Sequence, residues 1–374
     1  MNLALVGPIY PYRGGIAHYT TMLYRELVGQ GHRVFLCSFK RQYPHWLFPG
    51  RTDRDPSVRE PGIKGEYRLD SLNPLTWWAT ARAIRVRQPD TLILQWWTPF
   101  FALAWMTLAR VARRAGIRVI FICHNVFPHE RRPWDTWLVR WTLRLGDKFI
   151  VQSQDEKAQL LALLPGCPVE VVSMPIFDMF TDQAVSQEEA RRRLGLSEDA
   201  PVLLFFGFVR EYKGLRHLLD AMPAIRAELT GVRLLIVGEF WQDKQPYLDQ
   251  IRRLGIEDDV ITVDQYVPDE KVPVYFGAAD VVVLPYTHVT QSAVVQLAFG
   301  FGVPVITTRV GGLVEAVTPG KNGTLVEPGD VGALAKAVVS HFECRQLCVH
   351  QRGSSGEAQR RWDTLIKVLT EEPV

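Results

Sequence analysis

The chain has 374 residues, of which 47% are hydrophobic, and this length favours two folded domains over a single core. It contains no run of 18 uncharged apolar residues and no basic segment followed by an apolar signal core. The sequence therefore predicts neither a membrane-spanning helix nor secretion, and we expect a cytoplasmic protein. The net charge is only +3, but residues 1–178 carry 23 Lys and Arg against 14 Asp and Glu, whereas the remainder carries 20 against 26. A basic first half is compatible with nucleic acid, an anionic membrane, a phosphorylated substrate or a solvated surface.

The first half begins with a predicted strand, a glycine loop and a helix. The apolar run Leu3–Val6 passes through "GPIYPYRGG" into a segment with apolar residues at helical spacing. At such a junction the bare backbone N–H groups near Gly14 and Gly15, together with the helix N-terminus, favour an anion. The alternation continues, with strands predicted at 34–39, 91–95, 117–122 and 148–151 and helices near 15–29, 75–87, 100–114 and 134–144.

The second half repeats the alternation with new sequence. Strand-like runs such as "VLLFFGFV", "RLLIVGEF" and "VPVITTRV" alternate with helical patterns such as 214–228 and 330–342. This order predicts an α/β chain with two doubly wound, Rossmann-like domains. A proline, an aromatic pair and a charged helix interrupt the strand pattern near Pro175, and we therefore predict domains at 1–178 and 179–350. Residues 351–374 begin with a Ser/Gly linker and continue as a helix with Trp362 on its apolar side.

Two motifs of the second half suit phosphate groups. Arg210 and Lys213 follow the strand "VLLFF" and its Gly207, which puts two cations at the carboxyl end of a strand. A diphosphate fits there, because charge-assisted hydrogen bonds are the stronger ones. Further along, a helix that begins near Ser292 offers the free N–H groups of its first turn as a second phosphate cradle.

These motifs carry a resemblance to a known family. With "GPIYPYRGGIAHYT", "YKGLRHLLDA", "GFGVPVITTRVGGLVEAV" and "NGTLVEPGD" in this order, the chain resembles a retaining glycosyltransferase of family 4 (group 1) with the GT-B fold, nearly from end to end. The resemblance implies two domains that face each other across a cleft. The C-terminal domain would hold a nucleotide diphosphate sugar, and the N-terminal domain would hold a glycan or glycolipid acceptor, as in surface polysaccharide synthesis. It also implies retention of configuration, no metal, no cofactor besides the nucleotide sugar, and a tail helix that often crosses back to the N-terminal domain.

The resemblance also assigns roles to residues. Arg210 and Lys213 would neutralise the donor diphosphate as the glycosidic bond breaks, and His124, at the end of the strand in "FICHN", would bond a hydroxyl of the transferred sugar. The other candidate donor-binding residues are Gly14, Gly15, Gly207, Gln291, Ser292, Ala293, Val294 and Gln296. The candidate acceptor-binding residues are Tyr10, Arg13, His129 and Glu130.

Three positions depart from the family pattern. Many relatives have two glutamates, the second of which binds ribose, where this chain has Val289 and Leu297, and Phe208 replaces the usual arginine after the strand's glycine. The sugar and base of the donor therefore stay open, and so does a second hypothesis, a catalytically silent nucleotide-sugar-binding or scaffold protein. A nicotinamide-dependent oxidoreductase is a weaker alternative, because "GPIYPYRGG" is not G-x-G-x-x-G.

Two further segments bear on partners. "NPLTWWATARAIRVRQPD" places Trp77 and Trp78 beside three arginines, Arg82, Arg85 and Arg87. This amphipathic pattern fits a membrane interface, although packing of the tryptophans in the core fits equally well. Peripheral contact with the inner face of the membrane is therefore one expectation. Nucleic acid is not expected, because no binding module accompanies the basic residues. The "DRD" at 53–55 lies in a polar loop, and we predict no metal site there.

Overall fold

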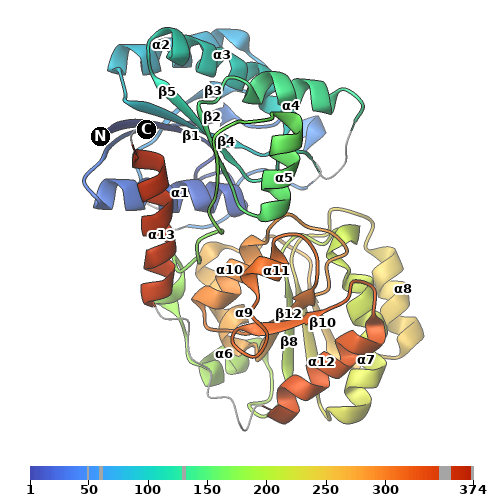
Figure 1. Cartoon of the computed structure of the whole chain (residues 1–374). Helices are drawn as coiled ribbons and strands as arrows, with labels where there is room; N and C mark the ends of the chain where they lie inside the picture. Colours follow the sequence, from blue (N-terminus) through green and yellow to red (C-terminus); the bar gives the residue numbers. More distant parts are fainter. Residues whose placement is uncertain (49, 59–61, 129–131, 345–354, 372–374) are drawn as a thin grey trace. The chain divides into compact units, whose positions relative to one another are not determined.

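The computed structural model describes residues 1–48, 50–58, 62–128, 132–344 and 355–371. The contacts within the chain divide it into two compact units, and Figure 1 labels most of their helices and strands. The first unit consists of Met1–Asp55, Glu60–Met174 and Gln359–Val374, and the second of Pro56–Arg59 and Pro175–Ala358.

The described part of the first unit contains a parallel sheet of seven strands in the order β3-β2-β1-β4-β5-β6-β7. The strands are β1 Asn2–Val6, β2 Arg33–Arg41, β3 Glu66–Asp70, β4 Thr91–Trp96, β5 Arg118–Cys123, β6 Lys148–Val151 and β7 Val169–Val171. The helices are α1 Gly15–Gly29, α2 Pro74–Arg87, α3 Ala102–Arg114, α4 Asp135–Leu143, α5 Gln154–Leu163 and, from Gln359 onward, α13 Ser355–Thr370.

The described part of the second unit contains a parallel sheet of six strands in the order β10-β9-β8-β11-β12-β13. The strands are β8 Val202–Phe206, β9 Arg233–Val237, β10 Val260–Val263, β11 Val281–Leu284, β12 Val305–Thr308 and β13 Gly323–Val326. The helices are α6 Gln187–Leu194, α7 Leu215–Glu228, α8 Gln245–Leu254, α9 Val272–Ala278, α10 Ala293–Gly300, α11 Leu313–Ala316 and α12 Val331–Cys344. Two doubly wound parallel sheets confirm the predicted fold class.

The strands form where the sequence is apolar without alternation. All six residues of β4 and the last four of β1 are buried, as expected for strands covered by helices on both faces. In each sheet the strand order reverses next to the first strand, between β1 and β4 in the first sheet and between β8 and β11 in the second. The loops that follow the two neighbouring strands therefore run in opposite directions. In open sheets of this kind, ligands bind outside the carboxyl ends of the strands at that point.

The final helix, α13, belongs to the first unit. Its Trp362 is 1% exposed, and the indole lies 5.6 Å from the ring of Tyr19 on α1. The ammonium of Lys148 on β6 donates to the carbonyl of Val368 at 3.1 Å, and Gln30 donates to Asp363 at 2.9 Å. The apolar side of the tail helix is thus part of the core of the first unit.

Candidate functional site

The loop between β8 and α7 is fixed at the carboxyl edge of the second sheet. Gly207 follows β8 with φ +95°, and the 3₁₀ turn Glu211–Lys213 leads to Gly214 with φ +68°. A Cβ on Gly214 would lie 1.8 Å from the carbonyl oxygen of Pro285, so only glycine lets this loop approach the residue after β11 so closely. The loop therefore holds its cations at the edge where the fold binds ligands.

Lys213 is a buried cation in this loop. The residue is only 8% exposed. Its Nζ lies 5.6 Å from the centre of the Tyr286 ring, and a Cβ added to Gly207 would lie 3.0 Å from the same Nζ. Burial, and next the charge of Arg210, lowers the pKa of Lys213 to about 8. Within the part of the chain that the structure describes, no carboxylate forms an ion pair with Lys213. A buried charge without a counter-charge is costly, and a bound anion would offset that cost.

The N-terminus of α10 adjoins the same ammonium. Val294, in the first turn, has its Cγ2 3.3 Å from the Cβ position of Gly207, which itself adjoins Lys213. The Ser292 hydroxyl caps the helix by accepting from the Val295 N–H at 3.4 Å. The N–H groups of Ala293 and Val294 have no acceptor within the helix, and they add the positive end of the helix dipole to the lysine charge. The structure thus brings together Gly207, Lys213, Ser292, Ala293 and Val294, five of the residues predicted from sequence.

The predicted glutamines lie in different environments. Gln291 is partly exposed, and its amide lies against Gly312, where an added Cβ would be 1.9 Å from Gln291 Nε2. Gln296 is only 1% exposed and Leu297 7%, so both face the interior of the unit. Gln291 is therefore the glutamine that a ligand at this edge could reach with least rearrangement.

An aromatic cluster at this edge was missed by the sequence reasoning. The ring of Phe208 lies 4.2 Å from that of Trp241 and 5.9 Å from that of Tyr266, and the Arg210 guanidinium lies 5.7 Å from the centre of the Trp241 ring. These residues follow β8, β9 and β10, together with the buried Glu239. The signal available in the sequence was their position: each comes shortly after a predicted strand, in "GFVR", "GEFW" and "DQY".

The loop between β1 and α1 has the geometry predicted for it. Gly14 caps α1 with φ +107° and no side-chain cap, so the first N–H groups of the helix are not covered by a side chain. The Arg13 N–H donates to the carbonyl of Asp53 at 3.1 Å, and the Asp55 N–H donates to the carbonyl of Pro11 at 2.8 Å. The "DRD" segment is therefore a backbone partner of this loop. The carbonyl of Tyr10 accepts from the Tyr67 hydroxyl.

His124 lies at the carboxyl end of β5, inside a network of polar side chains. Its Nε2 is 2.6 Å from Oε1 of Gln95, its Nδ1 is 3.3 Å from Nε2 of Gln152, and Tyr19 packs edge-on at 4.8 Å. The residue is 5% exposed, and burial lowers the pKa of His124 to about 3. The ring is therefore neutral at physiological pH, with Nε2 as donor and Nδ1 as acceptor for these amide orientations. The sequence did not indicate that Gln95 and Gln152 belong to the site, because each is only a polar residue that follows the apolar residues of a strand. The predicted acceptor residues His129 and Glu130 lie outside the described residues.

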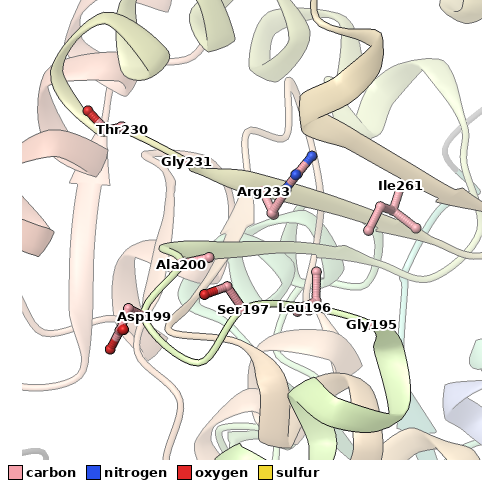
Figure 2. Close-up of a pocket in the computed structure, with 9 residues that line it drawn as sticks. All are labelled: Gly195, Leu196, Ser197, Asp199, Ala200, Thr230, Gly231, Arg233 and Ile261. Carbon is pink, nitrogen blue, oxygen red and sulfur yellow. The ribbon is translucent and has the colours of Figure 1, made fainter.

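A cavity among the described residues lies elsewhere in the second unit. It has a volume of about 450 Å³ and is shown in Figure 2. Its lining comes from the segment before β8 and from the starts of β9 and β10, namely Gly195, Leu196, Ser197, Asp199, Ala200, Thr230, Gly231, Arg233 and Ile261. It is thus at the amino ends of the strands, opposite the edge that holds Lys213. Among the described residues, no helix combines the length and the apolar character needed to cross a membrane.

Comparison with known proteins gives matches to both units. Residues 13–176 match the family described as Glycosyltransferase Family 4, and residues 200–343 match Glycosyl transferases group 1. The chain is 34% identical to the D-inositol 3-phosphate glycosyltransferase of Thermobifida fusca, over 59% of this chain and 55% of that protein. It spans about half the length of several such curated relatives.

Two further matches extend over almost the whole chain. The GDP-mannose-dependent alpha-(1-6)-phosphatidylinositol monomannoside mannosyltransferase of Mycobacterium tuberculosis is 32% identical, over 96% of this chain and 94% of that one. The structure of Anabaena HepE in complex with UDP has a TM-score of 0.74 and 19% identity, and it covers 99% of this chain and 100% of that one. The second match is a likeness of fold.

Proposed function

This chain belongs to the group 1, family 4 glycosyltransferases and has the GT-B fold, and we propose that it transfers a sugar from a nucleotide diphosphate donor to a glycan or lipid-linked acceptor, with retention of configuration and without a metal. The observation that carries the proposal is the buried Lys213 ammonium beside the N-terminus of α10. Both are positive groups held in place before any ligand arrives, at the edge of the sheet where the fold takes its ligands.

The chemistry follows from the charge that such a reaction creates. When the bond between the anomeric carbon and the diphosphate oxygen breaks, its electron pair leaves with the diphosphate. Lys213 and the N–H groups of Ala293 and Val294 stabilise that charge without having to reorganise. The acceptor hydroxyl bonds to the anomeric carbon on the face that the diphosphate left, and its proton goes to the departing phosphate. Lys213 and α10 supply the positive charge that a metal supplies in other transferases.

The remaining roles are part of the same proposal. Arg210 lies beside Lys213 and adds positive charge at the donor phosphates. Gln291 takes a ribose hydroxyl in place of the family glutamate, and Gly14 and Gly15 offer backbone N–H groups to the donor. His124 bonds a sugar hydroxyl by giving up its longer contact, the 3.3 Å one to Gln152. Tyr10 and Arg13 contact the acceptor.

The names of relatives define the first substrates to try. GDP-mannose is the donor in the name of the mycobacterial relative, and UDP is bound in the structure of HepE. We therefore propose assays with GDP- and UDP-sugars, in which release of nucleoside diphosphate is measured without acceptor, and with glycolipid and oligosaccharide acceptors. Transfer that persists in the presence of a chelator, with a product whose anomeric configuration matches the donor by NMR, is the expected result. Inversion or a strict need for a divalent cation would contradict the corresponding part of the proposal.

The silent binder remains the second candidate, because Val289 and the buried Leu297 replace two glutamates of many relatives, the second of which binds ribose. Calorimetric titration with UDP and GDP separates the two. The enzyme binds at least one of them and turns over at least one donor. Binding of a diphosphate without hydrolysis or transfer across the panel would instead favour the silent protein.

A further inference from the structure

One side of the first unit is unusually basic and aromatic. Helices α2, α3 and α4 pack next to one another, α2 on α3 and α3 on α4. Within the bounds of these helices there are seven arginines and a single acidic residue, Asp135. Asp135 is 5% exposed, and its carboxylate accepts from the backbone N–H of Arg132 at 2.8 Å, so it offers little negative charge to the outer surface.

Helix α4 and its N-cap carry three exposed tryptophans. Trp134, Trp137 and Trp141 are 57%, 51% and 44% exposed, and their spacing of three and four residues puts them on the same side of the helix. The rings of Trp137 and Trp141 are 4.0 Å apart, and the guanidinium of Arg132 lies 6.0 Å from the centre of the Trp134 ring. Indoles this large are normally buried, so a row of three on a surface marks an interaction site.

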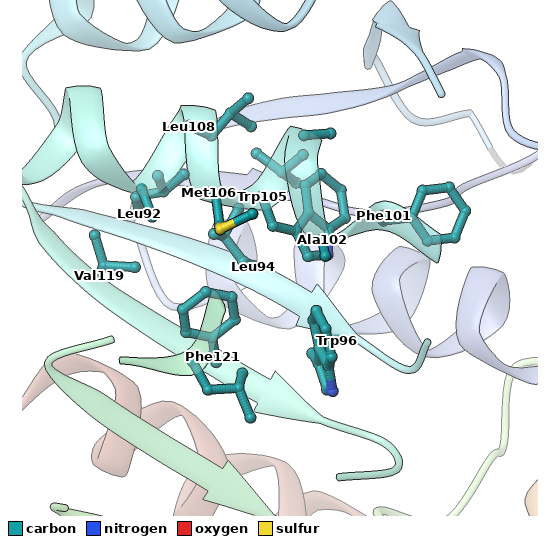
Figure 3. Packing of buried hydrophobic residues seen from close by; sticks show 14 of the residues in the cluster. Leu92, Leu94, Trp96, Phe101, Ala102, Trp105, Met106, Leu108, Val119 and Phe121 are labelled. Atoms are coloured by element: carbon teal, nitrogen blue, oxygen red, sulfur yellow. The ribbon is translucent and has the colours of Figure 1, made fainter. Parts of the chain in front are cut away.

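The neighbouring helices continue this outer face. On α2, Trp77 is 9% exposed and belongs to the core, whereas Trp78 is 57% exposed and Leu75 77%. On α3, Trp105 packs inward over the sheet (Figure 3), whereas Leu103 is 57% exposed. Each helix thus has its own complement of buried aromatic or aliphatic residues and presents additional ones outward. The exposed set is therefore not an unfinished core.

We propose that this outer face, formed by Trp78, Trp134, Trp137, Trp141, Leu75, Leu103 and the exposed arginines of α2, α3 and α4, binds the surface of an anionic lipid bilayer. Indoles favour the boundary between lipid head groups and acyl chains, because they have an apolar body and a polar N–H. Guanidinium groups pair with lipid phosphates and are attracted by the negative surface potential. Because the same face of a second copy would carry the same positive charge, self-association through it is disfavoured.

The position of α4 links this face to the reaction. The chain leaves β5 at Cys123, passes His124 and reaches Trp134 at the start of α4, so the start of the helix is at the carboxyl edge of the same sheet. A bilayer that contacts the tryptophans would therefore present a lipid-linked acceptor to the edge that holds His124. The inference deepens the proposed lipid-linked acceptor and rests on it for its purpose. Its test uses neither donor nor acceptor, so failure of sugar transfer and failure of membrane binding are distinguishable.

The test is cosedimentation of the full chain with vesicles. We expect binding to phosphatidylcholine vesicles that contain phosphatidylglycerol, weak binding to phosphatidylcholine alone, and release as salt is raised, because the attraction is screened within about 8–10 Å at ordinary ionic strength. The triple variant W134S/W137S/W141S should lose about tenfold or more of the affinity for anionic vesicles. Brominated lipids should quench the tryptophan fluorescence of the native chain far more than that of the variant.

Matched variants locate the effect. Trp46→Ser removes a tryptophan that is 79% exposed but lies outside these helices, and it should bind vesicles like the native chain. R82A/R110A/R140A should lower binding to anionic vesicles and leave the weak binding to neutral ones unchanged. Equal binding to neutral and anionic vesicles, equal binding by the triple tryptophan variant, or absence of binding by the native chain would overturn the proposal. So would binding of single-stranded RNA through the tryptophans without vesicle binding. Thermal unfolding of each variant checks that these surface changes leave the fold intact.

Discussion

The polar residues at the carboxyl edges of the two sheets are arranged in opposite ways. In the first unit, His124 has both ring nitrogens in contact with the amides of Gln95 and Gln152. In the second unit, Lys213 is buried beside a helix N-terminus and another cation, without an ion pair to a carboxylate among the described residues. The first arrangement is complete by itself, whereas the second is electrostatically unfavourable until an anion binds. The difference suggests that the charge-stabilising part of the site lies in the second unit.

Replacement of Lys213 tests this difference between the two units, and we expect it to have the largest effect on the rate of sugar transfer. Lys213→Ala should lower the rate of sugar transfer by about 100-fold to 1,000-fold, because it removes a preorganised positive group where negative charge develops. Lys321→Ala is the matched control, since Lys321 is an exposed lysine of the same unit at the amino end of β13. Steady-state kinetics with the best donor measure both. A Lys213→Ala enzyme with native activity would remove the lysine from the mechanism.

Acid unfolding tests the arrangement around His124 in the first unit. The pKa of His124 is lowered to about 3 in the folded chain, below its ordinary value near 6.5, so below pH 6.5 the unfolded chain binds the additional proton. Because of His124, the free energy of unfolding should therefore fall by roughly 1 kcal/mol per pH unit as the pH decreases from 6.5 towards 3. Urea unfolding at several pH values should show a shallower slope for His124→Asn. His45→Asn, at an exposed histidine, should leave the slope unchanged, and an unchanged slope in His124→Asn would mean that the ring is not held neutral.

The fold was largely predictable because its signals are local. Apolar runs such as Leu92–Leu94 and glycine-containing turns such as that of Gly214 identify strands and their connections wherever both faces of the sheet are covered. The sequence reasoning missed β3, "EYRLD", because an edge strand is only partly buried and its side chains are mostly polar. It also missed β7, which has three residues, too few for a pattern.

The site was predictable only in part, for a different physical reason. Lys213 and Ser292 lie next to recognisable strand-loop-helix junctions, so sequence position alone indicated them. The pairing of His124 with Gln95 and Gln152 joins residues from β4, β5 and the segment after β6, and only the strand order brings these segments together. The stacking of Phe208 on Trp241 likewise depends on β8 and β9 being neighbours.

The pH dependence of diphosphate binding tests whether Lys213 binds the diphosphate, and we expect an effect of intermediate size. The pKa of the lysine is about 8 in the free chain, and a bound anion favours the charged form and raises it. Above pH 8 the free chain loses this proton and must take it up again on binding, so affinity for UDP or GDP should fall by up to about tenfold per pH unit. Lys213→Arg keeps its charge throughout and should bind with little pH dependence. Calorimetric titration across this range measures both, and parallel profiles for the two proteins would contradict the assignment.

Arg210 is expected to contribute the smallest effect, and it does so in two opposing ways. Its guanidinium lies over the rings of Tyr212 and Trp241 at 5.4 and 5.7 Å and is partly exposed, so its attraction for a diphosphate is reduced by solvent. Its charge also helps to lower the pKa of Lys213, so removing it makes the lysine a better cation.

Arg210→Ala should therefore weaken diphosphate binding by only about threefold to tenfold at neutral pH. The same variant should move the midpoint of the pH profile upward, which the loss of a simple phosphate contact would not do. Arg252→Ala, at an exposed arginine of α8, should change neither quantity. If Arg210→Ala weakened binding as much as Lys213→Ala with no shift of the midpoint, the two cations would be acting as equal phosphate ligands, and the lysine would lose its distinct place in the comparison.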